Sequence, residues 1–343
     1  MDPTNVAVIG GGSWGTALAA LLARKLPEVT LWAREPEVAE GINSHHHNPL
    51  FIPDLSLPEN LHASSDLASV VQVHRTLVVV IPTQFTRSIL KEIRNLADPE
   101  THFISASKGI EVERLTLISE MYDEVFGPEV AHRVCFLSGP SFARDVIAGQ
   151  PAAVAVAGRD ADTTEAVQNL FSSPQFRAYR TDDVVGVELG GALKNVIALA
   201  AGISDGLGFG HSARAALITR GLAEIIRLGA RLGGRPETFA GLSGLGDLLL
   251  TATSDLSRNR VVGVRLGSGE TLAEIQQGTR EVAEGVKTAL SVHHLSQKLG
   301  VDMPISAAVY EILYEEREPR SVVSELMRRG LRAESDWKGR PRG

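Results

Sequence analysis

The chain has 343 residues, of which 43% are hydrophobic and 22% are charged, a balance typical of globular proteins. A chain of this length exceeds what one hydrophobic core usually organises, so we expect two domains. The formal net charge of −7 argues against nucleic-acid binding, which needs clustered basic side chains to neutralise phosphates. An anionic small-molecule partner must therefore be bound by a few local cations.

Cys135 is the only cysteine, which excludes an intramolecular disulfide. Its apolar neighbours in 134–137 predict a buried strand thiol, and this fits a reducing cytoplasm. The residues before Val6 lack the cationic stretch of a secretory signal. No apolar run approaches the ~20 residues of a membrane span. We therefore expect a cytoplasmic protein without a membrane span.

The first half of the chain alternates short β-rich runs with helical patterns. Strands are predicted at 6–9, 29–32, 76–81, 102–106, 134–137 and 152–157. These runs are mostly continuously apolar, which is typical of strands covered on both faces in a parallel sheet. Residues 1–182 are therefore predicted to form a doubly wound, Rossmann-like α/β domain. The adjacent histidines at 45–47 do not share a helix face, so we expect no metal site there.

The predicted strands stop near Asp183, and helical patterns follow. Helices are predicted at 184–207, 213–232, 257–266, 281–299 and 305–317, separated by turn-forming residues. Residues 183–343 are therefore predicted to form an all-α domain.

A glycine-rich motif follows the first predicted strand directly. Gly10, Gly12 and Gly15 have the Gly-x-Gly-x-x-Gly spacing and lead into a predicted helix. In this context the glycines permit a tight turn and close backbone approach to a pyrophosphate, which the helix N-terminus then binds. The motif therefore predicts a dinucleotide site.

The end of the second strand bears on the choice of cofactor. In NAD-binding folds an Asp or Glu about 20 residues after the glycines binds the ribose hydroxyls. This chain has Arg34 there, followed by Glu35. A guanidinium can bind the 2′-phosphate of NADP, so NADP is mildly favoured over NAD. Glu35 leaves NAD open, and a solvated loop position for Arg34 is the alternative.

Lys194 is the only charged residue between Glu188 and Asp205, in an apolar helical pattern. A helix that is apolar on nearly all sides is buried, and lysine is almost never fully buried without a partner. Lys194 is therefore predicted to face a cleft, with a pKa lowered by desolvation toward a value useful for proton transfer. The alternative is a lysine whose stem reaches the surface.

Two further motifs carry polar groups. Ser257, Arg258 and Asn259 open a predicted helix, and a helix N-terminus beside an arginine can bind a phosphate. Ser257 is also an ordinary N-cap residue. The turn at 244–247 presents the carboxylate of Asp247, which suits either a helix cap or a catalytic acid.

Eight ordered motifs make the chain resemble the bacterial-type NAD(P)-dependent glycerol-3-phosphate dehydrogenases. They lie at 10–17, 43–49, 107–110, 138–143, 192–196, 244–247, 257–259 and 284–286. The resemblance covers most of the chain and implies reversible hydride transfer between NAD(P)H and dihydroxyacetone phosphate. It also implies a homodimer that supplies glycerol 3-phosphate for glycerophospholipid synthesis. His45 and His47, in the variable region before Asn48, and the tail beyond Arg320 depart from the pattern without touching a site residue.

The resemblance also assigns roles to individual residues. The implied cofactor contacts are Gly10, Gly12, Ser13, Trp14, Gly15, Arg34, Lys108, Ala143, Arg258, Val282 and Glu284. The implied substrate contacts are Lys108, Gly139, Ser141, Lys194, Asp247, Ser257, Arg258 and Asn259. Lys194 is implied as the proton donor and acceptor, with Lys108 and Asp247 as the other catalytic residues.

Two other functions remain as alternatives. A β-hydroxyacid dehydrogenase has the same two-domain plan, but its helical lysine and asparagine are separated by three residues, whereas Lys194 and Asn195 are adjacent. A non-catalytic NAD(P)H sensor is expected to lack the lysine, whereas Lys194, Lys108 and Asp247 are all present.

Overall fold

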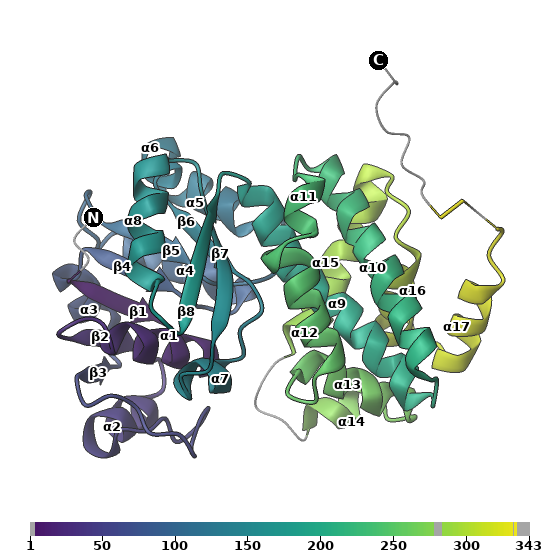
Figure 1. Ribbon diagram of the computed structural model, residues 1–343, viewed down its shortest axis with the longest axis horizontal. Helices are drawn as coiled ribbons and strands as arrows, with labels where there is room; N and C mark the ends of the chain where they lie inside the picture. Colours follow the sequence, from purple (N-terminus) through teal and green to yellow (C-terminus); the bar gives the residue numbers. More distant parts are fainter. Residues whose placement is uncertain (1–3, 278–282, 332, 335–343) are drawn as a thin grey trace.

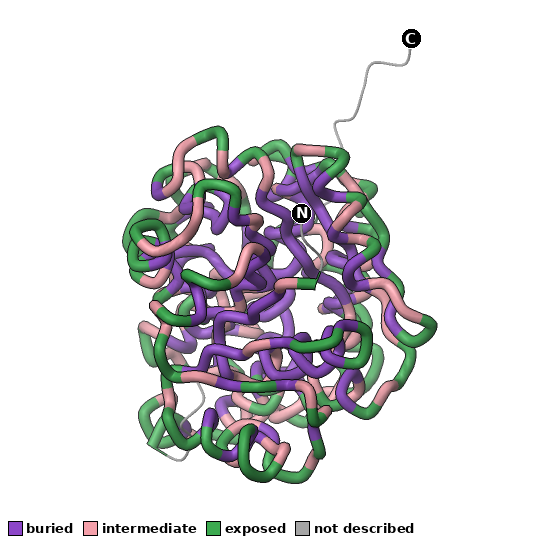
Figure 2. Tube along the Cα trace, turned by 90° about the vertical axis from the view of Figure 1, so that its left-hand side faces the viewer, coloured by how far each residue is buried: buried purple, intermediate pink, exposed green. Residues whose placement is uncertain are grey.

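The computed structural model describes residues 4–277, 283–331 and 333–334. Its N-terminal part is built on one twisted sheet, and its C-terminal part is a helical bundle beside that sheet (Figure 1). Buried residues run through the interior of the molecule, and exposed residues lie on its outside (Figure 2). This division agrees with the predicted fold class of a Rossmann-like domain followed by helices.

The sheet has eight strands in the order β3-β2-β1-β4-β5-β6-β7-β8. Their bounds are Val6–Ile9 (β1), Val29–Trp32 (β2), Leu61–Ser64 (β3), Thr76–Val79 (β4), His102–Ser105 (β5), Cys135–Ser138 (β6), Ala152–Gly158 (β7) and Phe176–Thr181 (β8). Six neighbouring pairs are parallel, and only β6 and β7 pair antiparallel. The chain order reverses at β1, so a ligand crevice is expected at the carboxyl ends of β1 and β4.

The prediction from sequence was wrong at the ends of this sheet. It omitted β3 and β8, whose burial alternates along the strand, because it searched for continuously apolar runs. It also expected a parallel sheet, whereas β7 pairs antiparallel with β6. β7 runs antiparallel because the connecting helix α7 (Ala143–Ile147) has only five residues. A helix that short does not carry the chain back to the opposite edge, which a parallel crossover requires.

Helices cover both faces of the sheet. Besides α7 they are Ser13–Ala23 (α1), Pro36–His45 (α2), Leu67–Val73 (α3), Thr83–Arg94 (α4), Ile118–Phe126 (α5), Pro128–His132 (α6) and Ala161–Phe171 (α8). Along β1, Val6 and Val8 pack in one core cluster, and Ala7 and Ile9 pack in another. Cys135 in β6 is buried, and burial raises the pKa of its thiol to about 12. The continuously apolar strands are thus explained by two covered faces.

The helical part surrounds a single central helix. Its elements are Val184–Gly206 (α9), His211–Arg231 (α10), Pro236–Phe239 (α11), the π-helical turn Leu242–Gly246 (η1), Asp247–Thr253 (α12), Arg258–Gly267 (α13), Leu272–Gln277 (α14), Glu284–Leu299 (α15), Pro304–Tyr314 (α16) and Pro319–Met327 (α17). Glycines let α13 approach α9 closely: a Cβ on Gly202 would lie 2.1 Å from the Arg260 carbonyl oxygen. This contact brings the start of α13 toward the middle of α9.

Helix α9 contradicts the expectation that no apolar run in the chain approaches the length of a membrane span. With 23 residues and a mean hydropathy of 1.5 over its most apolar window, it is long and apolar enough to cross a membrane. Of that window, 94% is buried inside the protein, and the other helices of the bundle lie around it (Figure 1). Its apolar surface is therefore accounted for as the core of the helical part.

Candidate active site

The glycine-rich turn leaves the N-terminus of α1 open. Gly10 has φ +133°, and a Cβ there would lie 2.3 Å from the Val80 carbonyl oxygen, so only glycine fits. A Cβ on Gly15 would lie 1.9 Å from the Gly10 carbonyl oxygen, whereas one on Gly12 would meet no atom within 4 Å. No side chain of the described residues caps α1. An uncapped helix N-terminus facing open space fits the pyrophosphate of a dinucleotide.

Ser13 and Trp14 form the first turn of α1, where the predicted cofactor site places them. The indole Nε1 of Trp14 is buried and has no hydrogen-bond partner among the described residues. The Nζ of Lys108 lies 6.0 Å from the centre of the Trp14 ring. The side chain of Asn48 donates to the Gly11 carbonyl over 2.8 Å and so ties the loop after α2 to this turn. Lys108 therefore lies beside the predicted cofactor turn.

Arg34 lies two residues beyond the end of β2, and its side chain is 75% exposed. Its guanidinium donates to the Glu35 carboxylate over 3.1 Å and 3.3 Å. Arg34, which favours NADP, and Glu35, which leaves NAD open, thus form an ion pair with each other. In a pair this exposed, water screens the attraction, and the guanidinium can be redirected toward a phosphate at little cost.

The centre of the site is a buried carboxylate between two ammonium groups. Asp247, the first residue of α12, is 1% exposed. Its Oδ2 accepts a hydrogen bond from Lys108 Nζ over 2.8 Å, and its Oδ1 accepts one from Lys194 Nζ. Lys108 follows β5, and Lys194 lies in the middle of α9. Three chain segments therefore meet at one cluster of charges.

The environment of Lys194 lowers its pKa. The residue is 8% exposed, and burial together with the nearby charge of Lys108 outweighs the attraction of Asp247, so the pKa falls to about 8. A lysine with that pKa is present in both protonation states near neutral pH and can both give and accept a proton. The lowered pKa agrees with the desolvation predicted for Lys194 from the sequence.

The segment after β6 adds a backbone acceptor to the cluster. The Gly139 carbonyl oxygen lies 3.4 Å from Lys108 Nζ and 3.0 Å from Ser141 Oγ. Gly139 has φ +154°, and a Cβ on it would lie 2.8 Å from the Val154 Cα. The conformation that brings this carbonyl toward Lys108 therefore depends on glycine.

The start of α13 lies against α9 beside the lysine. Ser257 caps α13 by accepting a hydrogen bond from the Arg260 N–H over 3.3 Å. The Asn259 amide donates to the Asn195 side-chain oxygen over 3.0 Å, and its own oxygen accepts from the Gly285 N–H over 2.9 Å. The predicted motif therefore joins α9, α13 and α15, and Arg258 is exposed beside it.

Glu284 begins α15 and lies close to the same charges. Burial raises the pKa of its carboxyl to about 7, while the nearby Arg258, Lys108 and Lys194 oppose that rise. Ala143 begins α7, after the Ser141 segment. Val282, the remaining predicted cofactor contact, lies outside the described residues.

The segment that follows β4 was not predicted from the sequence as part of the site. Phe85, in the first turn of α4, is 54% exposed. Gln84, beside it, forms hydrogen bonds with the backbone that follows Lys108. The signal was available, because ligands of doubly wound folds bind at the carboxyl ends of the strands where the strand order reverses.

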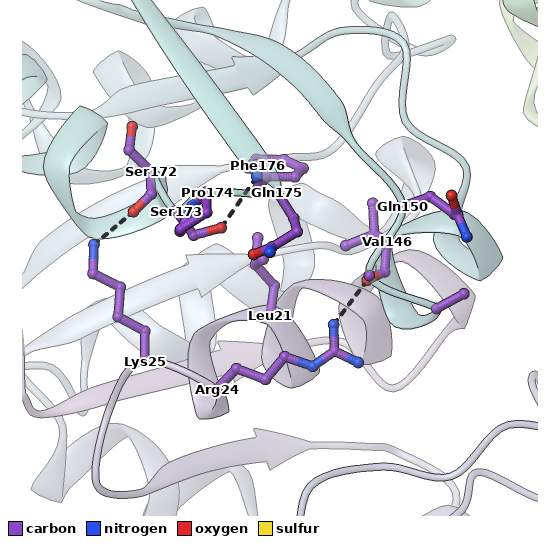
Figure 3. Close-up of a pocket in the computed structure, with 12 residues that line it drawn as sticks. Leu21, Arg24, Lys25, Val146, Gln150, Ser172, Ser173, Pro174, Gln175 and Phe176 are labelled. Atoms are coloured by element: carbon purple, nitrogen blue, oxygen red, sulfur yellow. Dashed lines mark hydrogen bonds between the residues drawn. The ribbon is translucent and has the colours of Figure 1, made fainter.

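A separate cavity of about 500 Å³ lies at the other end of α1 (Figure 3). It is lined by the end of α1, by residues from Val146 to Gln150 and by the segment 172–176. Its two cations are engaged with backbone: Arg24 donates to the Val146 carbonyl over 3.1 Å, and Lys25 donates to the Ser172 carbonyl over 2.9 Å. The cluster around Asp247 does not line it.

Comparisons with known proteins agree with this geometry. The model of the NAD-dependent glycerol-3-phosphate dehydrogenase N-terminus matches residues 5–164, and that of the C-terminus matches 183–324. Glycerol-3-phosphate dehydrogenase [NAD(P)+] of Geobacter metallireducens is 53% identical over 329 residues, covering 96% of this chain and 98% of that protein. The corresponding protein of Citrifermentans bemidjiense is 52% identical with the same coverage.

Solved structures give the same result. The glycerol-3-phosphate dehydrogenase of Coxiella burnetii superposes with a TM-score of 0.90 at 38% identity, covering 94% of this chain and 98% of that chain. The Saccharomyces cerevisiae enzyme superposes with a TM-score of 0.79 at 31% identity, covering 94% and 99%. The chain therefore belongs to the NAD-dependent glycerol-3-phosphate dehydrogenase family.

Proposed function

We propose that this protein is an NAD(P)-dependent sn-glycerol-3-phosphate dehydrogenase that interconverts dihydroxyacetone phosphate and glycerol 3-phosphate. The observation that carries the proposal is the buried cluster in which Asp247 binds both Lys108 and Lys194. An NAD(P)H sensor needs no such acid-base cluster, and the close relatives do not favour a β-hydroxyacid dehydrogenase. Loss of the near-ultraviolet absorbance of NADPH on addition of dihydroxyacetone phosphate tests the reaction directly.

The cofactor would be held along the carboxyl edge of the sheet. Gly10, Gly12 and Gly15 leave room for the pyrophosphate, and the N–H groups of Ser13 and Trp14 would bind it at the start of α1. The other proposed contacts are Arg34, Lys108, Ala143, Arg258, Val282 and Glu284. When bound, the nicotinamide supplies or accepts the hydride.

Lys194 is the proposed proton donor and acceptor. In reduction its ammonium protonates the developing alkoxide of the substrate, and in oxidation the neutral amine removes the hydroxyl proton. Lys108 stabilises negative charge on the same oxygen. Asp247 binds both Nζ atoms and so orients Lys194 while keeping the two ammonium groups together in a buried place. The remaining proposed substrate contacts are Gly139, Ser141, Ser257, Arg258 and Asn259.

The first prediction concerns recognition of the substrate phosphate. Arg258→Ala is expected to raise the KM for dihydroxyacetone phosphate by about 10- to 100-fold, because a hydrogen bond to a charged group contributes about 1.5–3 kcal/mol. The KM for unphosphorylated dihydroxyacetone should change much less. Initial rates with both substrates, and with the exposed Arg231→Ala as a control, check this. Equal losses with both substrates would assign Arg258 a structural or cofactor role.

The second prediction concerns the choice of cofactor. Wild type should prefer NADPH by about tenfold, because one charge-assisted hydrogen bond is worth about 1.5–3 kcal/mol and Glu35 competes for the guanidinium. Arg34→Ala should abolish that preference, whereas Glu35→Gln should strengthen it by releasing Arg34. The measurement is kcat/KM for NADPH and NADH in the three proteins. A ratio that is the same in all three would remove Arg34 from the cofactor site.

Several broader properties belong to the same proposal. We place the dinucleotide-binding domain at residues 1–182 and the substrate-binding, catalytic domain at 183–343, since β8 ends at Thr181 and α9 begins at Val184. We also propose that the protein is a cytoplasmic homodimer whose product enters glycerophospholipid synthesis. These assignments rest on the family. Light scattering at several protein concentrations tests the dimer.

A further inference from the structure

The segment that carries Lys108 has no regular secondary structure, yet its backbone is tightly fixed. Gly109 has φ +155°, and a Cβ on it would lie 2.5 Å from Thr83 Oγ1. The next residue, Ile110, is completely buried. The backbone of this segment therefore has little conformational freedom, and the contacts around Ile110 fix the position of the Lys108 backbone.

Two side chains from different helices donate hydrogen bonds to the Ile110 carbonyl. Gln84 Nε2 of α4 donates to it over 3.0 Å, and Ser291 Oγ of α15 donates to it over 2.9 Å. The Gln84 Oε1 also accepts from the Val112 N–H over 3.0 Å. Gln84 therefore binds one backbone acceptor and one backbone donor of the segment. Ser291 connects the same Ile110 carbonyl to helix α15 of the helical part.

A second anchor lies one residue further along. The guanidinium of Arg87 donates to both carboxylate oxygens of Glu111, over 2.6 Å and 2.7 Å. Arg87 is 9% exposed and Glu111 is 5% exposed, and the pair lowers the pKa of the Glu111 carboxyl. Because this ion pair remains when Gln84 is changed, the segment should stay folded while the position of Lys108 is loosened.

We propose that Gln84, acting together with Ser291 on the Ile110 carbonyl, is a positioning residue that places the Lys108 ammonium against Asp247 and beside Lys194. The proposal rests on the proton-transfer role given to Lys194 above. Gln84 acts here on the backbone of the segment, two residues from Lys108. Its effect on the reaction is therefore transmitted through Lys108.

This role has a consequence for the pH dependence of the reaction. The charged groups that act on Lys194 are Lys108 after β5 and Asp247 of α12, and Glu284 of α15 interacts with Lys194, Lys108 and Arg258 of α13. Lys108 lowers the pKa of Lys194 because two ammonium groups repel, whereas Asp247 raises it. If Lys108 withdraws, the pKa of Lys194 should rise, and the pH profile in both reaction directions should move to higher pH.

The experiment measures kcat, KM and the pH profile of kcat/KM for Gln84→Ala. We expect kcat to fall about tenfold, less than the about 10²-fold that a 1 Å misplacement can cost. The part of the pH profile that follows the ionisation of Lys194, called here the Lys194 limb, should move to higher pH. Ser291→Ala should shift the limb in the same direction. Gln168→Ala is the matched control, because its Nε2 donates to the Ala178 carbonyl over 2.9 Å, between α8 and β8. Ser296→Ala, in α15, is the control for Ser291.

An unchanged limb in both Gln84→Ala and Ser291→Ala would overturn the proposal, even if kcat fell, because a purely structural defect leaves the pKa of Lys194 where it was. If Gln84→Ala does not fold, Gln84→Met takes its place: it keeps the length of the side chain without adding a charge, but it neither donates to Ile110 nor accepts from Val112, so a shift in the same direction is expected. A Lys194→Met variant with high activity would overturn the proton-transfer role instead, so the two failures are distinguishable.

Discussion

Replacing Lys194 by methionine is expected to lower kcat by about 10²–10⁴-fold, the usual contribution of a positioned acid-base group. Methionine has a similar length and fits an apolar helix, so the fold and cofactor binding should persist. The fold is checked by the melting temperature and cofactor binding by quenching of the intrinsic tryptophan fluorescence, with the exposed Lys298→Met as control. A variant that keeps more than about a tenth of the wild-type kcat would contradict the role, given the expected loss.

The pH profile of the wild-type enzyme provides an independent check on Lys194. Its pKa is lowered to about 8, first by burial and then by Lys108. Reduction of dihydroxyacetone phosphate needs the ammonium, so kcat/KM should fall as the pH rises through about 8. Oxidation of glycerol 3-phosphate needs the free amine, so it should rise through the same value. Lys194→Arg, which keeps the charge but does not titrate in this range, should lose this limb.

The sequence predicted the middle of the sheet better than its edges. β1 and β4 are buried on both faces and are apolar at every position except Thr76, which makes their pattern easy to recognise. β3 and β8 alternate buried and more exposed residues, and short alternating segments are also compatible with loops. The antiparallel direction of β7 depends on the length of helix α7, and the hydrophobic pattern of the strand itself does not determine that length.

In the candidate site, too, the sequence pattern identified single residues but not the long-range contacts between them. Lys194 stands out in the sequence because a lone charge in an apolar helix needs a partner. Its partner, Asp247, is 53 positions away, and the bond from Lys108 to Asp247 spans 139 positions. Those contacts arise from the packing of α9, α12 and the segment after β5, so sequence spacing does not reveal them. Gln84 could have been found from its place after β4, where the strand order reverses, but its bonds to the segment after Lys108 are likewise set by packing.

Replacing Asp247 by asparagine should affect the reaction as strongly as removing the lysine. The amide oxygen can accept from one Nζ, but the amide NH₂ group must then face the other ammonium, where no acceptor is left. Removing one partner of a buried ion pair costs about 3–5 kcal/mol of folding stability. Lys194 also loses the group that positions it, so kcat/KM should fall by about 10²–10⁴-fold, the usual contribution of a positioned acid-base group. The melting temperature should fall as well, because two buried charges lose their counter-ion.

The direction of the pH shift in Asp247→Asn distinguishes loss of the carboxylate beside Lys194 from a general structural defect of the site. Without the carboxylate, the repulsion from Lys108 is no longer opposed, so the pKa of Lys194 should fall further below its wild-type value. The limb for reduction of dihydroxyacetone phosphate should therefore move to lower pH, opposite to the shift expected for Gln84→Ala. Asp205→Asn, which removes a carboxylate bound by Arg214 and Arg260, should lower stability without moving the limb. A shift of the Asp247→Asn limb to higher pH would show that Asp247 does not stabilise the Lys194 ammonium.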